Sequence, residues 1–349
     1  MATGGEDRAS ARVTVARRRP APVNRSAIVL PEPPSDLPPD IAERLEAHAR
    51  SARGALAPET ERALRKASAA FTAWAATERA SPLPCTAETV ARYVDDLAER
   101  ACKPATIRQA VWAVGTMHRA AGLTDPTKAE EVRLALKRMT RSLGTRQRQA
   151  APVGEDDVRL LLRLVGPEPS LRVQRDVALL LTMRDLLARR SEAVALDVED
   201  VTSSPDGSGT VLIRRSKTDQ AGEGEVLWLS PRTMTHLKRW LDLAAIEAGA
   251  IFRAINKAGR VMRRLASGAV PPIVKGLAAT AGLDASAFSG HSARVGMTQD
   301  LAAAGSELPA IMQAGRWKSP TMPARYAERQ FAGRGAVARY YGRRGDGSP

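Results

Sequence analysis

The chain has 349 residues, 44% of them hydrophobic and 26% charged, which is enough for about two globular domains with cores of their own. Its formal net charge is +15, and arginine supplies most of the positive charge. This surplus predicts a polyanionic partner, because planar guanidinium groups match phosphate oxygens well. A basic surface that is merely solvated is the alternative. The longest apolar run, residues 177–181, is too short to cross a bilayer, so we expect no membrane partner.

Cysteine usage argues against a metal centre. Cys85 and Cys102 are the two cysteines, and neither stands at metal-ligand spacing from other ligand residues. We therefore expect no metal, no cofactor and a reducing compartment. The N-terminal residues lack the charged-then-apolar pattern of a secretory signal, so a cytoplasmic protein is expected.

The first 143 residues divide into a tail and a helical region. Residues 1–38 are rich in proline, arginine and serine, which predicts a disordered basic tail. Residues 39–143 have helical periodicity throughout. One stripe falls at Val90, Tyr93, Val94 and Leu97, after Thr86 as a suitable N-cap. Four or five such helices predict a compact bundle.

A second helix in this region begins near Thr106, with Ile107, Val111 and Val114 along one side. Its neighbouring face carries Arg108 and Gln109. Residues 144–153 have no apolar period and are predicted to be a basic interdomain linker. A second domain then covers residues 154–349.

The second domain is predicted to be mainly helical with a small antiparallel β-sheet. Residues 210–215 and 225–229 are short runs rich in β-branched or aromatic residues, joined by a polar loop with Gly222 and Gly224. The segment from about Thr233 to Arg339 is predicted to be mostly helical again. The fold class expected for the whole chain is therefore mainly α.

Two possible reactive groups precede the last third of the chain. Arg189 and Glu192 stand three apart on a helix, so the carboxylate can orient the guanidinium group. Lys217 lies in the loop between the strands, where it can reach a bound nucleic acid and act as a general acid. An ordinary surface ion pair and a solvated lysine are the alternative interpretations.

The densest concentration of reactive residues lies between Ser289 and Tyr326. His291 and Arg294 stand three apart, so one helix face can present both to one phosphate. Trp317 either belongs to the core or donates its indole N–H to a phosphate oxygen. Tyr326 has charged neighbours and is a candidate oxygen nucleophile, which surrounding cations would activate. Tyr340 and Tyr341 are its rivals.

The candidate reactive residues, taken in their order along the chain, resemble the catalytic set of the tyrosine recombinases, also called the phage integrase family. The residues that carry the resemblance are Arg189, Glu192, Lys217, His291, Arg294, Trp317 and Tyr326, with Ser289–Gly296 and Ile311–Gly315 as further motifs. The resemblance covers roughly residues 39–342. It implies a C-shaped clamp on double-stranded DNA, formed by a helical core-binding domain (39–143) and a catalytic domain (154–349).

The resemblance also implies a mechanism. Tyr326 would attack the scissile phosphate and leave a 3′-phosphotyrosyl bond and a free 5′-hydroxyl, with no need for ATP or metal. Arg189 and Arg294 would hold the non-bridging oxygens. The remaining roles are shared by four residues: His291 and Trp317 as donors, His291 also as proton acceptor, Lys217 as the acid for the 5′-oxygen, and Glu192 as an orienting group.

In this family four protomers exchange strands on two sites through a Holliday junction. A short C-terminal helix near residues 336–341 would dock into a neighbouring protomer, which makes Tyr340 and Tyr341 interface residues; packing back on its own domain is the alternative. Arg108 and Gln109 are candidates for contact with the major groove.

Two departures from the family pattern stand out. Arg316 occupies a position where a second glycine is expected, and Pro320 and Pro323 precede the tyrosine. We expect Ser319 to cap the Tyr326 helix, with both prolines in its first turn. Two other functions remain open: a DNA-binding protein of the same fold without strand exchange, and a cut-and-reseal enzyme such as a type IB topoisomerase or a telomere resolvase.

Overall fold

The computed structural model describes residues 38–344 except 147, 217–218 and 220–221. The predicted N-terminal tail and Lys217 lie outside these residues. The chain divides into two compact units, residues 1–147 and 148–349. In the described residues no helix is long and apolar enough to span a membrane.

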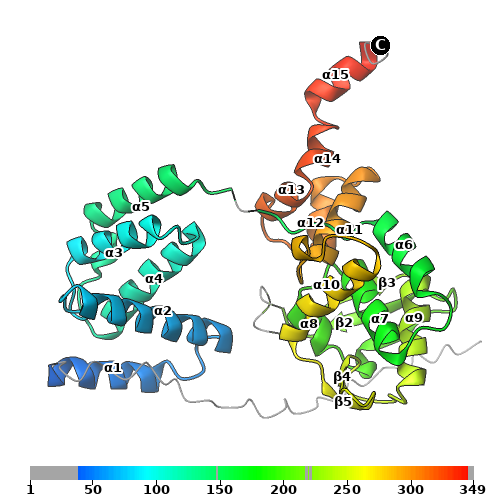
Figure 1. The fold of residues 1–349 in the computed structure, drawn as a ribbon, viewed down its shortest axis with the longest axis horizontal. Coiled ribbons are helices and arrows are strands. Elements are labelled where there is room, and N and C mark those ends of the chain that lie inside the picture. The colour runs from blue at the N-terminus through cyan, green and yellow to red at the C-terminus, as the bar shows by residue number, and fades with distance from the viewer. Residues whose placement is uncertain (1–37, 147, 217–218, 220–221, 345–349) are drawn as a thin grey trace, which may run out of the picture. The chain divides into compact units, whose positions relative to one another are not determined.

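The first unit is a bundle of helices (Figure 1). In chain order its elements are α1 (Pro39–Ser51), α2 (Pro58–Thr77), α3 (Ala87–Glu99), α4 (Pro104–Ala120), the 3₁₀ turn η1 (Pro126–Lys128) and α5 (Glu130–Leu143). Three of these helices start on a proline, whose missing N–H costs nothing in the first turn. Thr86 caps α3 as predicted, because its hydroxyl accepts the backbone N–H of Thr89 at 3.2 Å.

The predicted helix stripes form the core of this unit. The apolar stripe of α3 is buried, and Tyr93 packs against Phe71 and Trp74 of α2 with ring centroids 5.1 and 4.7 Å away. The buried residues of α4 include Ile107, Val111 and Val114, as expected. The same helix leaves Arg108 and Gln109 exposed on its other side, where Arg108 donates to Thr140 Oγ1 at 3.2 Å.

The second unit is larger and mainly helical. It contains α6 (Glu155–Val165), α7 (Leu171–Asp185), α8 (Arg190–Ala195), η2 (Val198–Asp200), β1 (Val201–Ser203), β2 (Gly209–Ile213), β3 (Glu225–Leu229), α9 (Pro231–Leu243), β4 (Arg253–Ile255), β5 (Val261–Arg264), η3 (Ser267–Ala269), α10 (Val270–Thr280), η4 (Ala285–Ala287), α11 (Ser292–Ala303), α12 (Leu308–Gly315), α13 (Thr321–Tyr326), α14 (Glu328–Ala332) and α15 (Ala336–Arg344). Helix α7 is its centre: residues 177–184 are all buried, as expected for a helix covered on every side, and it packs on α9, α10 and α11.

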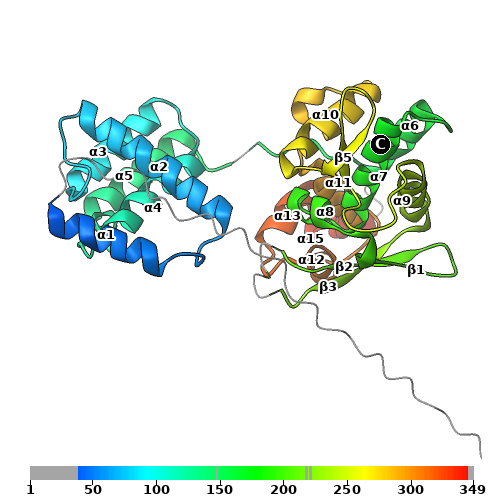
Figure 2. The same cartoon turned by 90° about the horizontal axis from the view of Figure 1, so that it is seen from below.

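The sheets of this unit are small and antiparallel. Strands β1, β2 and β3 form one sheet in that order, with Val211 opposite Val201 and Leu227 (Figure 2). The predicted pair of strands is thereby confirmed. The segment after Thr233 is mostly helical, as predicted, but it also contains a second small sheet, β4 with β5, which the sequence did not predict. These strands have three and four residues and carry several arginines, so they show no clear apolar alternation.

The stretch predicted as a linker is divided between the two units. The boundary falls between Gln147 and Arg148. Beyond it the backbone N–H of Ala151 donates to Ala287 O at 2.9 Å, and that of Val153 donates to Ser292 O at 3.0 Å. Val153 is also buried, so residues 148–153 belong structurally to the second unit.

One glycine explains how the segment 148–153 can lie so close to α11. A Cβ on Gly296 would stand 1.9 Å from the carbonyl oxygen of Val153, which no side chain could avoid. That same oxygen accepts a hydrogen bond from the buried Arg184 of α7. Gly296 therefore allows α11, which carries Arg294 and follows His291, to pack directly on the first residues of the second unit.

Candidate active site

The predicted catalytic residues come from the ends of several short elements of the second unit. Arg189 precedes α8, and Glu192 lies in its first turn. His291 precedes α11, and Arg294 lies in that helix's first turn. The other two follow: Trp317 lies after α12, and Tyr326 is the last residue of α13.

Glu192 orients Arg189 as the spacing predicted. Its Oε1 accepts a hydrogen bond from Arg189 Nη1 at 2.6 Å, and its Oε2 accepts the backbone N–H of Arg189 at 2.9 Å. The carboxylate is buried, with 3% of Glu192 exposed, whereas the Arg189 side chain is 19% exposed. The arginine thus keeps a face toward solvent while its partner is fixed inside.

Arg294 is held by the carboxyl ends of two helices. Its Nη1 donates to Leu187 O just beyond α7, and its Nη2 donates to Gly315 O at the end of α12, at 2.5 Å. Helix C-termini carry partial negative charge and free carbonyls, so they stabilise a buried guanidinium group. Leu187 reaches this position with φ +43°, an uncommon left-handed conformation for leucine.

An aromatic stack connects Arg294 to Tyr326. The Arg294 guanidinium carbon lies 4.0 Å from the centre of the Trp317 ring, as in a cation–π contact. The Tyr326 ring meets Trp317 edge-on, with centroids 6.0 Å apart and planes at 71°. Gly315 makes room for the indole, because a Cβ there would stand 1.8 Å from it. Trp317 therefore holds Arg294 and Tyr326 in one assembly.

Helix α13 begins at Thr321, after Pro320 at the N-cap position, and not at a Ser319 cap as predicted. Pro323 lies in the first turn, where its missing N–H removes no helical bond. Ala327 packs with Ala302 and Ile311 in a small apolar cluster. These features place Tyr326, which is partly buried, at the last position of a short, anchored helix.

Two glutamines that the sequence did not single out hold the end of this helix. The carbonyl oxygen of Tyr326 accepts Gln299 Nε2 at 2.9 Å and Gln149 Nε2 at 3.2 Å. Terminal carbonyls of a helix lack internal partners, so these amides fix the backbone that carries the phenol. Neither glutamine belongs to a sequence pattern that predicts this role.

His291 lies beside the arginines. Partial burial of the ring, followed by the positive charges of Arg294, Arg190 and Arg189, lowers the pKa of His291, although the residue keeps an exposed surface. A lowered pKa favours the neutral imidazole, which can accept a proton near neutral pH. Its backbone N–H donates to Ser289 Oγ at 3.1 Å, which fixes the turn before α11.

The site contains more positive than negative charge. Arg189, Arg294 and Arg316, with Glu192 between them, form what we call the arginine cluster: three guanidinium groups around one carboxylate. Burial, together with the charges of Arg189 and Arg316, lowers the pKa of Arg294 to about 9. A bound anion would relieve this repulsion, which makes the cluster suited to a phosphate group.

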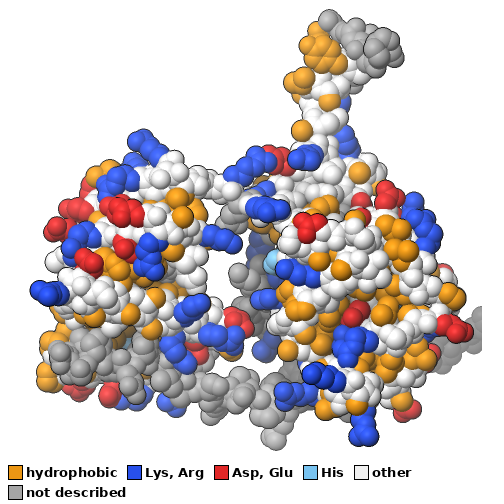
Figure 3. Space-filling view, viewed as in Figure 1, with side chains coloured by type: hydrophobic (Ala, Val, Ile, Leu, Met, Phe, Trp, Pro, Cys, Tyr) orange, Lys and Arg blue, Asp and Glu red, His pale blue; other side chains and the backbone are white. Residues whose placement is uncertain are grey.

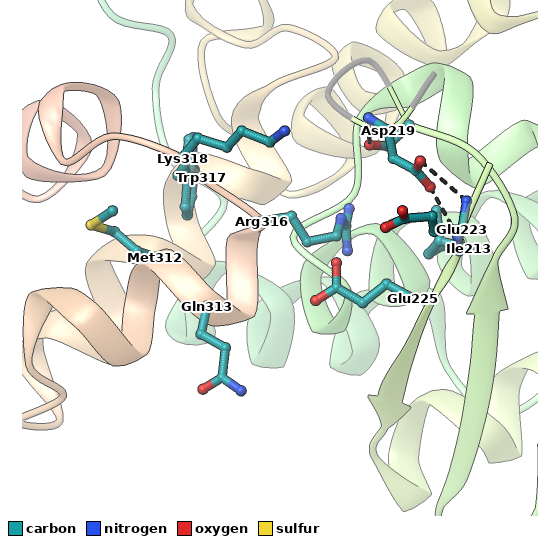
Figure 4. A pocket seen from close by; sticks show the side chains of 11 residues that line it. Ile213, Asp219, Glu223, Glu225, Met312, Gln313, Arg316, Trp317 and Lys318 are labelled. Carbon is teal, nitrogen blue, oxygen red and sulfur yellow. Dashed lines mark hydrogen bonds between the residues drawn. The ribbon is translucent and has the colours of Figure 1, made fainter. Parts of the chain in front are cut away.

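Beside the cluster lies a pocket of about 480 Å³ between the β2–β3 hairpin and the end of α12 (Figure 4). Trp317 and Lys318 line it on one side, and Asp219 and Glu225 on the other. The Asp219 carboxylate accepts the backbone N–H groups of residues 222, 223 and 224, which also lower its pKa. Lys217, which lies outside the described residues, stands in sequence between two residues of the pocket wall, Ser216 and Asp219.

Comparisons with known proteins identify the family. Residues 154–332, about half of the chain, match the Phage integrase family. The chain is 35% identical over 268 residues to the "Integrase/recombinase xerD homolog" of Selenomonas ruminantium, covering 74% of this chain and 78% of that protein. The chain belongs to the phage integrase family. It is thus a tyrosine recombinase, an enzyme that transfers DNA strands in site-specific recombination.

Other relatives agree with this assignment. "Recombinase cre" of Escherichia phage P1 is 26% identical over 304 residues, covering 82% of this chain and 89% of that protein. Among solved structures, the XerH recombinase bound to its difH substrate before cleavage has a TM-score of 0.56 at 14% identity, covering 82% of this chain and 80% of that chain. A lambda integrase dimer bound to a core site has the same TM-score at 15% identity, covering 82% and 76%. At such identities the structural likeness shows the fold alone.

Proposed function

We propose that this tyrosine recombinase cleaves DNA through Tyr326, forms a 3′-phosphotyrosyl bond and exchanges strands through a Holliday junction, as a Cre-like enzyme. The observation that carries the proposal is the stack of Arg294, Trp317 and Tyr326 beside the arginine cluster. It brings a phenol and an anion-binding group together from α11 and α13, which are separated in sequence.

The proposed reaction assigns a role to each group. Arg189 and Arg294 bind the non-bridging oxygens of the scissile phosphate and neutralise the charge that develops in the transition state. His291, as a neutral imidazole, accepts the proton of Tyr326 while the phenolic oxygen attacks phosphorus. The P–O bond to the 5′-oxygen then breaks, and Lys217 protonates that oxygen. Trp317 adds an indole donor and holds Arg294 in place.

Glu192 takes no part in bond formation; it keeps Arg189 oriented. The phosphotyrosyl bond conserves the energy of the phosphodiester, so another 5′-hydroxyl can replace the tyrosine without ATP. The exposed Arg108 and Gln109 of α4 are proposed to contact the DNA duplex, with residues 39–143 as the core-binding domain. The proposal places this reaction on DNA in the cytoplasm.

Assembly is proposed to use α15. This helix extends away from the rest of the second unit in Figure 1, and apolar side chains lie exposed along it in Figure 3. Val337 is 72% exposed, and Tyr340 and Tyr341 are also exposed. An apolar side that its own unit leaves uncovered suits docking into a neighbouring protomer, which supports a homotetramer on two DNA sites.

The experiment that tests this function works without a known target sequence. The purified protein is mixed with a library of randomised duplexes that carry nicks at several positions, and detergent-resistant protein–DNA adducts are sequenced. We expect the trapped duplexes to share one sequence, and two copies of it on a plasmid should yield exchanged products. Binding without adducts would indicate a DNA-binding protein, and adducts without exchange a cut-and-reseal enzyme; either result would contradict the proposal.

Lys217→Ala tests the general acid. We expect cleavage of the ordinary substrate to slow by about 10²–10⁴-fold, since proton donation to a poor leaving group contributes on this scale. A substrate with sulfur at the 5′-bridging position should restore the rate, because a thiolate leaves without a proton. Lys318→Ala, on the wall of the pocket beside the hairpin, is the control and should show no such rescue. Equal slowing of both substrates by Lys217→Ala would exclude this role.

A further inference from the structure

Arg316 occupies an unfavourable position for an arginine. Its φ is +57°, in the left-handed region that favours glycine, and only 9% of the residue is exposed. Its Nε has no hydrogen-bond partner in the described part of the chain. A strained backbone, a buried charge and an unpaired donor each cost free energy. Stability alone is therefore a poor explanation for an arginine at this position.

The contacts of Arg316 lead to the catalytic arginines. Its Nη2 lies 2.5 Å from Glu192 Oε2, and its Nη1 donates to Leu186 O at 3.2 Å. Glu192 Oε2 also accepts the backbone N–H of Arg189, so a single carboxylate oxygen joins the two arginines. Figure 4 shows the Arg316 side chain extending from the end of α12 toward the hairpin side of the pocket, away from Trp317.

We propose that Arg316 is a positioning residue, which keeps Glu192 ionised and thereby holds Arg189 in its phosphate-binding orientation. The proposal rests on the proposed function, because Arg189 is there assigned to the scissile phosphate. It adds a third arginine to the machinery, one that acts through Glu192 and does not touch DNA.

Electrostatics give this role a measurable signature. Burial raises the pKa of Glu192, but the charge of Arg316 and then the bonds and charge of Arg189 outweigh it, so the pKa is held below its usual value. Among the residues that the structure describes, the charged groups around Glu192 are Arg189 beside α8, Arg316 after α12 and Arg294 on α11. Without Arg316, burial opposes a weaker positive field, and the pKa of Glu192 rises. Glu192 would then take up a proton as the pH falls, and Arg189 would lose its ionised partner.

The test is single-turnover cleavage of a nicked site, measured from pH 5.5 to 9 with Arg316→Met. We expect the rate to fall by about tenfold per pH unit below the raised pKa and to approach the wild-type rate at high pH. Arg316→Lys, which keeps the charge, should restore much of the wild-type profile. The affinity for DNA should change by less than about threefold, because the loss is in positioning and not in DNA contact.

The double variant Arg316→Met/Glu192→Gln shows whether the loss of cleavage in Arg316→Met comes from protonation of Glu192 or from a damaged fold. Removing both partners of a buried pair is commonly tolerated, and no titrating carboxylate remains. The acidic decline seen with Arg316→Met should therefore disappear, leaving a rate like that of Glu192→Gln alone. A wild-type profile in Arg316→Met, or a loss that is independent of pH and additive with Glu192→Gln, would overturn the inference. Absence of adducts with the wild-type protein would instead contradict the proposed function itself.

Discussion

Tyr326→Phe should abolish covalent trapping on a nicked site while leaving the affinity for DNA within about twofold of wild type. Phenylalanine keeps the ring that packs edge-on against Trp317 but removes the oxygen that attacks phosphorus. Without that oxygen no phosphotyrosyl bond can form at this position, so cleavage should fall by more than about 10⁴-fold. Detergent-resistant adducts are counted on gels, and binding is measured by gel shift.

The matched controls for this variant are Tyr340→Phe and Tyr341→Phe. Both tyrosines are exposed on α15, where their rings meet edge-on with centroids 5.3 Å apart. We expect both variants to form adducts at close to the wild-type rate. Adducts that persist in Tyr326→Phe and vanish in one of these controls would move the nucleophile to α15.

Arg294→Lys should reduce cleavage by about 10²–10³-fold, the scale typical of losing one donor to a developing charge. The ammonium of lysine is a point donor and cannot bond to Leu187 O, bond to Gly315 O and stack on Trp317 at once. The geometry of the phosphate site is therefore lost even though its charge remains. Single-turnover rates on a nicked site measure the effect, and thermal unfolding checks that the fold persists.

Arg190→Lys is the control for this change, because Arg190 is adjacent to Arg189 and close enough to lower the pKa of His291. We expect its cleavage rate to stay within about threefold of wild type, since its charge is retained and no described hydrogen bond to the cluster is lost. If Arg294→Lys and Arg190→Lys changed the cleavage rate by the same factor, the proposed role of the buried Arg294 in binding the phosphate would be wrong.

The sequence predicted those parts of the fold that follow local rules. Helix periodicity and a Thr86 cap placed α3 and its buried stripe, and β-branched runs placed β2 and β3. Periodicity did not find β4 and β5, whose short arginine-rich strands are defined by pairing with each other. The start of α13 was predicted at Ser319, because serine is a common N-cap residue. In the structure Pro320 occupies the N-cap position instead.

The site was predictable where spacing on one element decides a contact. Arg189 and Glu192 are such a pair, and the structure shows their hydrogen bonds. The contacts of Arg316, Gln149 and Gln299 join elements far apart in sequence, so no local pattern predicts them. Arg316 stands out in the sequence as a departure from a glycine. The Arg316 side chain reaches Glu192 because its backbone adopts the left-handed conformation. That conformation is uncommon for arginine, so the residue type does not predict it.

The most direct test of the central claim is to identify the residue that carries DNA in the trapped adduct. The adduct is digested with nuclease and protease, and the peptide that retains a nucleotide is sequenced by tandem mass spectrometry. We predict a 3′-linked nucleotide on the phenolic oxygen of Tyr326, in the peptide that ends at Arg329. A nucleotide on Tyr340, on Tyr341 or on any residue other than a tyrosine would contradict the account.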